Sequence, residues 1–246
     1  MNEDIKYLYA TEFVIKDCHV NKDGYFRFSE FQTALVNAAT MQCKKYGIDI
    51  DSLIPKGLSW VISKIRIKFF AIPKVGDLLK IETWPVESGR LVFDRDFRVY
   101  ANGKVVAIAS SRWCVIDVKT RLPVRTNTIF SFDNNTNKKL IIDSAFVNQI
   151  ETLSTYKLSE HVVSENEIDI NGHLNNARYY DIAMQAIKKL DGQEANIKEV
   201  FIHYLRELLP GERIIIKSSL IDNTYYVFGY KDPNCEQVAF EFNAIV

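Results

Sequence analysis

Two stretches of the chain carry the hydrophobic repeat of an amphipathic helix. In 23–39 and again in 171–187, apolar residues recur at the three- and four-residue spacing that places them on one helical face. The stripe residues are Phe31, Ala34, Leu35, Ala38 and Ala39 in the first stretch, and Tyr179, Ile182, Ala183, Ala186 and Ile187 in the second, with Leu190 continuing the stripe just beyond it. Each predicted helix therefore has an apolar face that other elements must cover.

Several β-rich runs follow each predicted helix. They cover 60–70, 77–85, 90–101 and 104–118 after the first helix, and 197–206, 212–222, 224–232 and 235–246 after the second. Short polar turns at 101–104 and 231–234 separate the last two runs of each group, which is typical of antiparallel hairpins. A helix followed by pairing strands predicts an α+β unit in each half of the chain.

The two halves align with each other at two offsets. Pairing Gly76 with Gly211 gives an offset of 135 (211 − 76), and pairing Gly24 with Gly172 gives 148 (172 − 24). The difference of 13 (148 − 135) predicts an insertion in the first half, around 44–58. Such a repeat is the sequence signature of a duplicated structural unit.

The repeat predicts two similar units, at 1–130 and 151–246, joined by a linker at 131–150 that is rich in polar, turn-forming residues. The alternative is one continuous mixed domain whose halves are alike by chance. Within the units, Ser29 has capping-box spacing with Gln32, and Asn175 and Asn176 can cap the second helix.

Composition and charge remove several classes of function. Lys+Arg and Asp+Glu balance at 31 each, so no overall charge attracts nucleic acid or an anionic membrane. The 4 cysteines form no CxxC pair, which favours a reducing, cytoplasmic compartment without disulfides. We find no targeting segment or membrane span, and no nucleotide, serine-hydrolase or metal motif. We therefore expect no cofactor and no metal.

The residues just ahead of the second helix are unusually polar. The segment from Asp169 through Asn171 and His173 to Asn175 and Asn176 alternates acid, amide and imidazole side chains. In isolation, such residues most often cap a helix or form a turn. The repeat favours chemistry instead, because this polar set is assembled in only one half. The equivalent positions hold different residues: Asn21 for Asp169, Asp23 for Asn171 and Tyr25 for His173.

The pattern D-x-N-x-H-x-N-N-x-x-Y at 169–179 resembles the signature of the acyl-ACP thioesterase family, whose bacterial and plant members are tandem hotdog proteins. Downstream, Arg206-Glu207-Leu208 resembles that family's R-E-C segment, in which the glutamate is catalytic. The resemblance implies a tandem (double) hotdog fold, with two antiparallel sheets that each wrap a central helix. It also implies hydrolysis of acyl-ACP to free fatty acid and holo-ACP, in fatty acid biosynthesis.

Carried over by position, the resemblance makes Asp169, Asn171, His173 and Glu207 the catalytic group. The family's cysteine is Leu208 here, so that position offers no thiol nucleophile. Hydrolysis by water remains open, since Glu207 suits the role of base and Asn171 and His173 suit the role of hydrogen-bond donors. Amides near Asn175 and Asn176 can bind the substrate carbonyl. We expect burial among neighbouring leucines, Leu205, Leu208 and Leu209, to raise the pKa of Glu207.

The first half lacks this set, since Ile72 stands where the second half has Glu207. We therefore expect one site per chain, with the first half shaping the acyl pocket through Leu35, Met41 and Trp60; core packing is the alternative for each. The implied partner is an acyl carrier protein bearing the acyl-phosphopantetheine, and a homodimer stays open. Alternative functions are an acyl-CoA thioesterase and a non-catalytic acyl- or carrier-binding hotdog protein.

Overall fold

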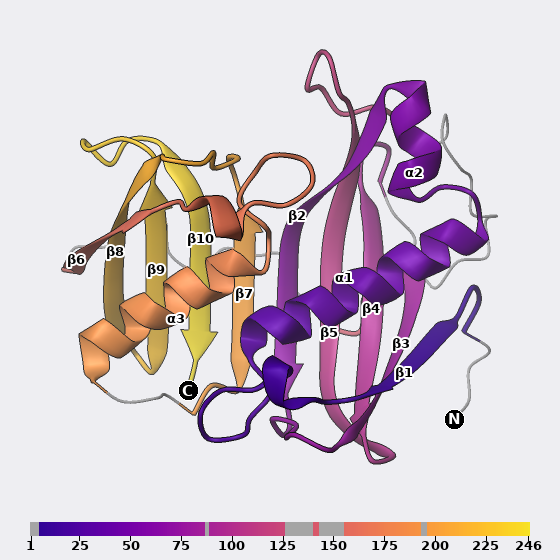
Figure 1. The fold of residues 1–246 in the computed structure, drawn as a ribbon, viewed down its shortest axis with the longest axis horizontal. Coiled ribbons are helices and arrows are strands. Elements are labelled where there is room, and N and C mark those ends of the chain that lie inside the picture. The colour runs from indigo at the N-terminus through magenta and orange to yellow at the C-terminus, as the bar shows by residue number, and fades with distance from the viewer. Residues whose placement is uncertain (1–4, 87–88, 126–139, 143–154, 193–195) are drawn as a thin grey trace. The chain divides into compact units, whose positions relative to one another are not determined.

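The structure, a computed structural model, describes residues 5–86, 89–125, 140–142, 155–192 and 196–246 of the chain. It divides into two compact units (Figure 1). The first holds Met1–Arg27 with Thr33–Ala145, and the second holds Phe28–Gln32 with Phe146–Val246. Most of the predicted linker at 131–150 lies outside the described residues.

The first unit is an antiparallel sheet with a long helix across one face (Figure 1). Its strand order is β1-β3-β4-β5-β2, with antiparallel pairing between all neighbours. The strands are β1 (Tyr9–Val14), β2 (Leu58–Phe69), β3 (Leu78–Val86), β4 (Phe93–Ala101) and β5 (Lys104–Asp117). The helices are α1 (Phe28–Lys45), whose first residues, Phe28–Gln32, group with the second unit, α2 (Ile50–Leu53) and the short 3-10 turns η1 (Asp17–His19) and η2 (Ile54–Lys56).

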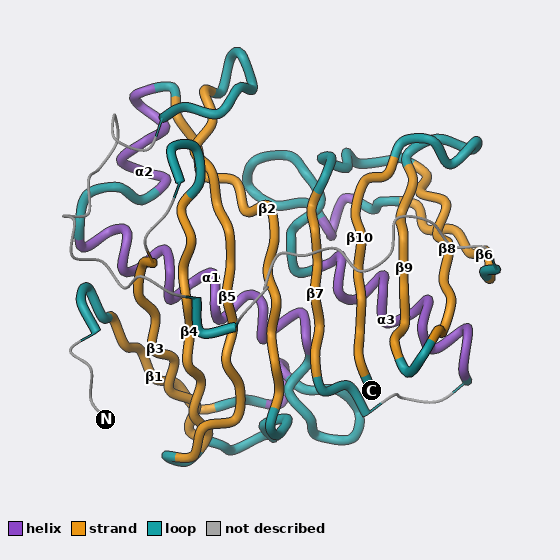
Figure 2. The backbone as a smooth tube through the Cα atoms, turned by 180° about the vertical axis from the view of Figure 1, so that it is seen from behind, coloured by secondary structure: helices purple, strands orange, loops and turns teal. Residues whose placement is uncertain are grey.

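The second unit repeats this plan with shorter strands. Its strand order is β7-β10-β9-β8-β6, again antiparallel throughout, and α3 packs on the sheet through β6, β8, β9 and β10. Seen from behind in Figure 2, the strands of this unit lie in front of α3. The elements are β6 (Lys157–Val162), η4 (Glu165–Glu167), α3 (Arg178–Asp191), β7 (Glu199–Tyr204), β8 (Arg213–Ile221), β9 (Thr224–Tyr230) and β10 (Val238–Ile245).

Both predicted helical stripes are buried, because they form the faces that meet the sheets. Every stripe residue of α1 is buried, and so is every stripe residue of α3 except Leu190, which is partly exposed. The expected cap at Ser29 is wrong: α1 begins at Phe28 with Arg27 as its N-cap, which leaves Ser29 buried inside the first turn. Among the described residues, no helix has both the length and the apolar character needed to cross a membrane.

Element boundaries confirm both predicted offsets. β1 and β6 have 6 residues each and begin 148 positions apart (157 − 9), while β3 and β8 have 9 residues each and begin 135 apart (213 − 78). The predicted insertion around 44–58 contains α2 and η2, which the second unit lacks in its described residues. The chain therefore builds the same α+β unit twice, with an added helical segment in the first.

Candidate active site

The loop that carries Asp169, Asn171 and His173 is closed by its own main chain. An isolated bridge joins Ile168 to Leu174 at its base. Inside it, the Asp169 N–H donates to the His173 carbonyl at 2.8 Å, and the Gly172 N–H donates to the Asp169 carbonyl at 3.0 Å. Gly172 has φ +81°, a left-handed conformation that glycine adopts without steric cost. The loop is thus a tight turn that ends a few residues before α3.

The Asp169 carboxylate holds the main chain of this turn. Its Oδ1 accepts hydrogen bonds from the N–H groups of Asn171, at 2.8 Å, and His173, at 3.5 Å. Its Oδ2 lies 3.4 Å from Nδ2 of Asn171, so the same carboxylate also orients the amide side chain. Asp169 therefore orients the main chain at Asn171 and His173 and the side chain of Asn171.

His173 and Glu207 come together although 34 positions separate them (207 − 173). His173 Nε2 lies 3.0 Å from Glu207 Oε2, with side chains 26% and 42% exposed respectively. The two segments are tied at the next residue, where the Leu174 N–H donates to the Leu208 carbonyl at 2.8 Å. An imidazole and a carboxylate in contact, both open to solvent, can hold a water and exchange a proton with it.

The expected burial of Glu207 among leucines is wrong. Leu208 is fully buried, but Leu205 and Leu209 are about two-fifths exposed, and Glu207 itself is exposed. The reason is the turn between β7 and β8: Leu208 packs inward, and its neighbours point outward.

Tyr179 lies beside this pair, although its place in the helical stripe indicated only core packing. Its ring meets Tyr204 and Phe240 edge-on, with centroids 5.1 and 5.2 Å away. Burial raises the pKa of its hydroxyl, and the negative charges of Glu207, Glu212 and Asp169 raise it further. Tyr179 therefore stays protonated next to the acids of the site. Its position in the D-x-N-x-H-x-N-N-x-x-Y pattern was the sequence signal for it.

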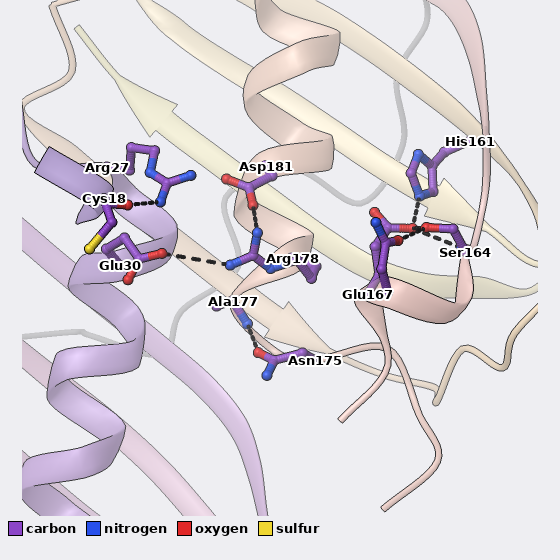
Figure 3. Close-up of polar contacts among 11 residues, drawn as sticks. Cys18, Arg27, Glu30, His161, Ser164, Glu167, Asn175, Ala177, Arg178 and Asp181 are labelled. Atoms are coloured by element: carbon purple, nitrogen blue, oxygen red, sulfur yellow. Dashed lines mark hydrogen bonds and ion pairs between the residues drawn. The ribbon is translucent and has the colours of Figure 1, made fainter. Parts of the chain in front are cut away.

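Asn175 and Asn176 lie in the turn that leads into α3. The Asn175 Oδ1 accepts a hydrogen bond from the Ala177 N–H at 2.9 Å, as Figure 3 shows. The main-chain carbonyl of Asn176 accepts the Tyr204 hydroxyl at 3.0 Å. The expected capping by Asn175 and Asn176 is wrong, because the N-cap of α3 is Ala177 and no side chain caps the helix; Asn175 instead holds the turn just ahead of it. Substrate binding by the two residues stays a prediction.

Glu167, just ahead of the site loop, is the centre of a small polar cluster (Figure 3). Its Oε2 lies 3.0 Å from His161 Nε2 and accepts hydrogen bonds from the Ser164 N–H and hydroxyl at 2.9 and 2.8 Å. Burial acts to raise the pKa of Glu167, but the bonds from Ser164 and the charge of His161 outweigh it, so the pKa lies below its ordinary value. The Glu167 carbonyl accepts the Asn175 N–H at 2.9 Å, which connects this cluster to the site loop.

The proposed pocket residues of the first unit lie in different surroundings. Leu35 is fully buried on α1, whereas Met41 on the same helix is 50% exposed. Trp60 donates its indole N–H to the Ile48 carbonyl at 2.6 Å and meets the Phe93 ring edge-on at 4.8 Å. These positions fit core packing for Leu35 and Trp60 and solvent contact for part of Met41, so their role toward an acyl chain stays a prediction.

None of the residues proposed for the site is a cysteine. The 4 cysteines are free thiols, and burial raises the pKa of Cys43 and of Cys114, which makes these two less reactive. Within the described ranges, no three His, Cys, Asp or Glu side chains gather as a metal site would require.

The first unit repeats the main-chain frame of the site loop. The Asn21 N–H donates to the Tyr25 carbonyl at 2.8 Å, and the Gly24 N–H donates to the Asn21 carbonyl at 3.0 Å, which are the same bonds and lengths as around Asp169. The Asn21 Oδ1 accepts the N–H groups of Asp23 and Tyr25 at 3.1 and 2.9 Å, as the Asp169 carboxylate does in the second unit. The turn itself therefore does not need an acid.

Both halves of the chain match the domains of one protein family. Residues 6–131 match the acyl-ACP thioesterase N-terminal domain, and residues 150–242 match the acyl-ACP thioesterase C-terminal domain. An oleoyl-acyl carrier protein thioesterase of Arabidopsis thaliana is 21% identical over 225 residues, which cover 82% of this chain and 60% of the relative. An acyl-[acyl-carrier-protein] hydrolase of Cuphea viscosissima is 22% identical over 217 residues, covering 81% and 52%. The chain thus spans only half to three-fifths of the length of these relatives.

Solved structures agree on the fold. An acyl-ACP thioesterase from Bacteroides thetaiotaomicron superposes with a TM-score of 0.86 at 24% identity, over 97% of both chains. A 12:0-ACP thioesterase from Umbellularia californica superposes with a TM-score of 0.81 at 15% identity, over 97% of this chain and 96% of the other. These matches confirm the predicted α+β tandem hotdog fold. With both of its halves matched by the family's two domains, the chain belongs to the acyl-ACP thioesterase family.

Proposed function

We propose that this protein hydrolyses the thioester of acyl-ACP and releases a free fatty acid and holo-ACP. The observation that carries the proposal is the contact of 3.0 Å between His173 Nε2 and Glu207 Oε2, in the unit that matches the family's C-terminal domain. A pair of this kind is what water-based acyl transfer needs, because one group can take a proton while the other donates a hydrogen bond.

In the proposed reaction, the Glu207 carboxylate takes a proton from a water whose oxygen attacks the thioester carbonyl carbon. The carbonyl oxygen gains negative charge, which the hydrogen-bond donors of Asn171 and His173 stabilise. When the carbon–sulfur bond breaks, the proton held by Glu207 passes to the sulfur, and the fatty acid and the carrier thiol leave. Asp169 contributes by orienting Asn171 and the His173 main chain, at the distances given above.

The contact supports an enzyme rather than a non-catalytic acyl- or carrier-binding protein. A binder has no use for a carboxylate held against an imidazole in a solvent-exposed turn, whereas a hydrolase needs both. The choice of acyl-ACP over acyl-CoA rests on the family and on the printed names of its relatives.

The proposal includes the partner and the place of action. The carrier protein presents the acyl-phosphopantetheine to the second unit, and the first unit shapes the acyl pocket through Leu35, Met41 and Trp60. The 4 well-separated cysteines support a reducing, cytoplasmic compartment. A single chain carries one complete set of site residues, and a homodimer is an open alternative for its assembly.

The test is a hydrolysis assay on acyl-ACP and acyl-CoA substrates of several chain lengths, with protein-free buffer as the blank for uncatalysed hydrolysis. We expect the wild-type protein to hydrolyse acyl-ACP with a higher kcat/KM than the matching acyl-CoA. Faster hydrolysis of acyl-CoA would replace the proposal by its closest alternative. Tight binding of acyl-ACP without hydrolysis above the blank would favour the non-catalytic protein.

A further inference from the structure

Glu207 lies on an irregular segment between β7 and β8 whose two ends are fixed by hydrogen bonds. At one end, the N–H groups of Leu205 and Arg206 both donate to the Ala239 carbonyl, at 2.9 and 3.0 Å. At the other end, the Leu209 N–H donates to the Glu212 carboxylate at 2.8 Å. The position of Glu207 therefore depends on what holds the middle of the segment.

The end bonds are part of the repeated frame. In the first unit, the N–H groups of Phe70 and Ala71 donate to the Val106 carbonyl at 2.7 and 3.2 Å, and the Lys74 N–H donates to the Asp77 carboxylate at 2.8 Å. The donors and the carboxylates of these bonds match those of the second unit at the offset of 135 (205 − 70), and the carbonyls of Val106 and Ala239 match at 133 (239 − 106). The same end bonds form whether the segment carries Ile72 or Glu207. They are therefore not specific to the candidate site.

Lys231 adds a bond that has no counterpart among the described residues of the first unit. Its Nζ donates to the main-chain carbonyl of Glu207 at 2.9 Å and lies 2.8 Å from Glu212 Oε1. In the described part of the first unit, no side chain donates to the carbonyl of Ile72, the residue equivalent to Glu207. The segment also has a side-chain bond from Arg206 to the Val238 carbonyl, where the first unit has Ala71. The Lys231 bond is the one that ends on the residue that the proposed chemistry needs in place.

Lys231 is itself held in a fixed position. It directly follows β9, and its N–H donates to the Gln237 carbonyl at 3.0 Å. The next residue, Asp232, accepts the N–H groups of Gln237 at 2.6 Å and Glu236 at 3.1 Å, and these bonds lower the pKa of its carboxyl. With its side chain only 24% exposed and an ion pair to Glu212, the ammonium group has little freedom to leave the Glu207 carbonyl.

We infer that Lys231 is a positioning residue for Glu207: it fixes the main chain from which the carboxylate reaches His173. The inference rests on the proposed function, in which Glu207 acts as the base. A shift of about 1 Å in a catalytic group can cost up to about 100-fold in rate, so a bond to the adjacent carbonyl is enough to matter. Arginine can also donate to the carbonyl and pair with Glu212, whereas methionine keeps the length of the side chain without either interaction.

The test compares Lys231→Met and Lys231→Arg with a matched control, Lys157→Met. Lys157 also donates its Nζ to a main-chain carbonyl of the same unit, that of Lys189 at 2.5 Å, but at the end of α3. We expect Lys231→Met to lower kcat about 10-fold to 100-fold with KM within about twofold of the wild type, because the carrier and acyl contacts are intact. Lys231→Arg should recover most of the loss, and Lys157→Met should leave kcat unchanged.

Two further measurements separate this inference from the proposed function. Peptide hydrogen exchange should be several-fold faster at 205–212 in Lys231→Met than in the wild type, and unchanged there in Lys157→Met. In a Glu207→Gln background, Lys231→Met should have no further effect on the residual rate, because no base remains to be positioned. Wild-type kcat in Lys231→Met, or an equal loss in the Glu207→Gln background, would overturn the inference while leaving the hydrolase proposal standing. If the wild-type protein fails to hydrolyse any acyl substrate, the proposed function fails, and unchanged exchange at 205–212 would reject the role of Lys231 as well.

Discussion

The loops at 21–26 and 169–174 have the same main-chain hydrogen bonds and different side chains. Both are closed by an Asx-type acceptor, Asn21 in one and Asp169 in the other, and both contain a glycine with positive φ. The side chains differ at the positions proposed for chemistry. The first loop has Tyr25 where the second has His173. The frame is therefore a property of the repeated fold, and the candidate chemistry is added on top of it.

The support beneath each loop also differs. In the first unit, Phe13 and Phe26 meet the His19 ring edge-on, at centroid distances of 6.1 and 6.2 Å. In the second unit, the positions of Phe13 and His19 hold His161 and Glu167, which form a polar contact of 3.0 Å. One loop is supported by aromatic packing and the other by charge, so pH and salt should affect the two loops differently.

The largest expected effect is on Glu207. Glu207→Gln keeps the shape of the side chain and removes its basicity, so kcat should fall by about 10²–10⁴-fold. The matched change in the first unit, Ile72→Gln, should leave kcat within about twofold of the wild type. Steady-state hydrolysis of acyl-ACP measures both, and near-normal turnover in a folded Glu207→Gln protein would refute its role as base.

His173→Ala comes next. We expect a loss of about 10²–10³-fold in kcat, the usual cost of removing one donor to a developing oxyanion. The loss should be similar for every acyl chain length, because His173 is proposed to contact the thioester that all substrates share. Tyr25→Ala in the equivalent loop should leave the rate unchanged. A loss that depends strongly on chain length would instead place His173 along the acyl pocket.

Asp169→Asn tests whether the acid is needed beyond the turn. Asn21 accepts the same main-chain bonds with an amide oxygen. The free energy of unfolding of the variant should therefore lie within about 0.5 kcal/mol of the wild-type value. The rate should nevertheless fall about 10-fold, since the amide orients Asn171 less strongly than a carboxylate does. Chemical denaturation and kcat measured on one preparation give both values. Equal activity would show that the acid serves only the turn.

Gly172→Ala and Gly24→Ala should cost about 1 kcal/mol each in the free energy of unfolding. An added Cβ would meet nothing within 4 Å at Gly172, and only Val75 Cγ1 at 3.8 Å at Gly24, so the cost comes from the positive φ of +81° or +79° alone. Only Gly172→Ala should also lower kcat. If both substitutions lowered kcat equally, the proposal that only the loop at 169–174 takes part in the reaction would be wrong.

The smallest effect concerns Glu167 and depends on pH. Its pKa is lowered in the fold, so it stabilises the protein above its unfolded-state pKa of about 4.3, and this contribution is lost as the pH falls through the lowered value. Glu167→Gln should lower the free energy of unfolding by about 0.5–1 kcal/mol at pH 7, and by progressively less as the pH falls below about 4.3. Denaturation curves from pH 7 into the acid range provide the measurement, and a difference that does not shrink as the pH falls would point to packing instead.

The sequence predicted the framework of the molecule better than its site. The spacing of apolar residues located both helices, and two glycine pairs located the repeat to the residue, because periodicity and turn geometry are local properties. The contact between His173 and Glu207 followed only from the resemblance, since nothing local links positions so far apart. The exposure of Glu207, the helix start at Phe28 and the place of Tyr179 beside the acids depend on how strands and turns pack, which no local pattern encodes.

The doubled frame also has a consequence for engineering. The first unit has a loop that already closes with the same main-chain bonds, so the candidate catalytic side chains could be introduced a second time by substitution alone, without redesign of the backbone. Asn21→Asp, Asp23→Asn, Tyr25→His and Ile72→Glu would supply the side chains, and a lysine donating to the carbonyl at position 72 would supply the remaining support. The molecule therefore has one candidate catalytic loop and one loop of the same main-chain geometry that could accept its side chains.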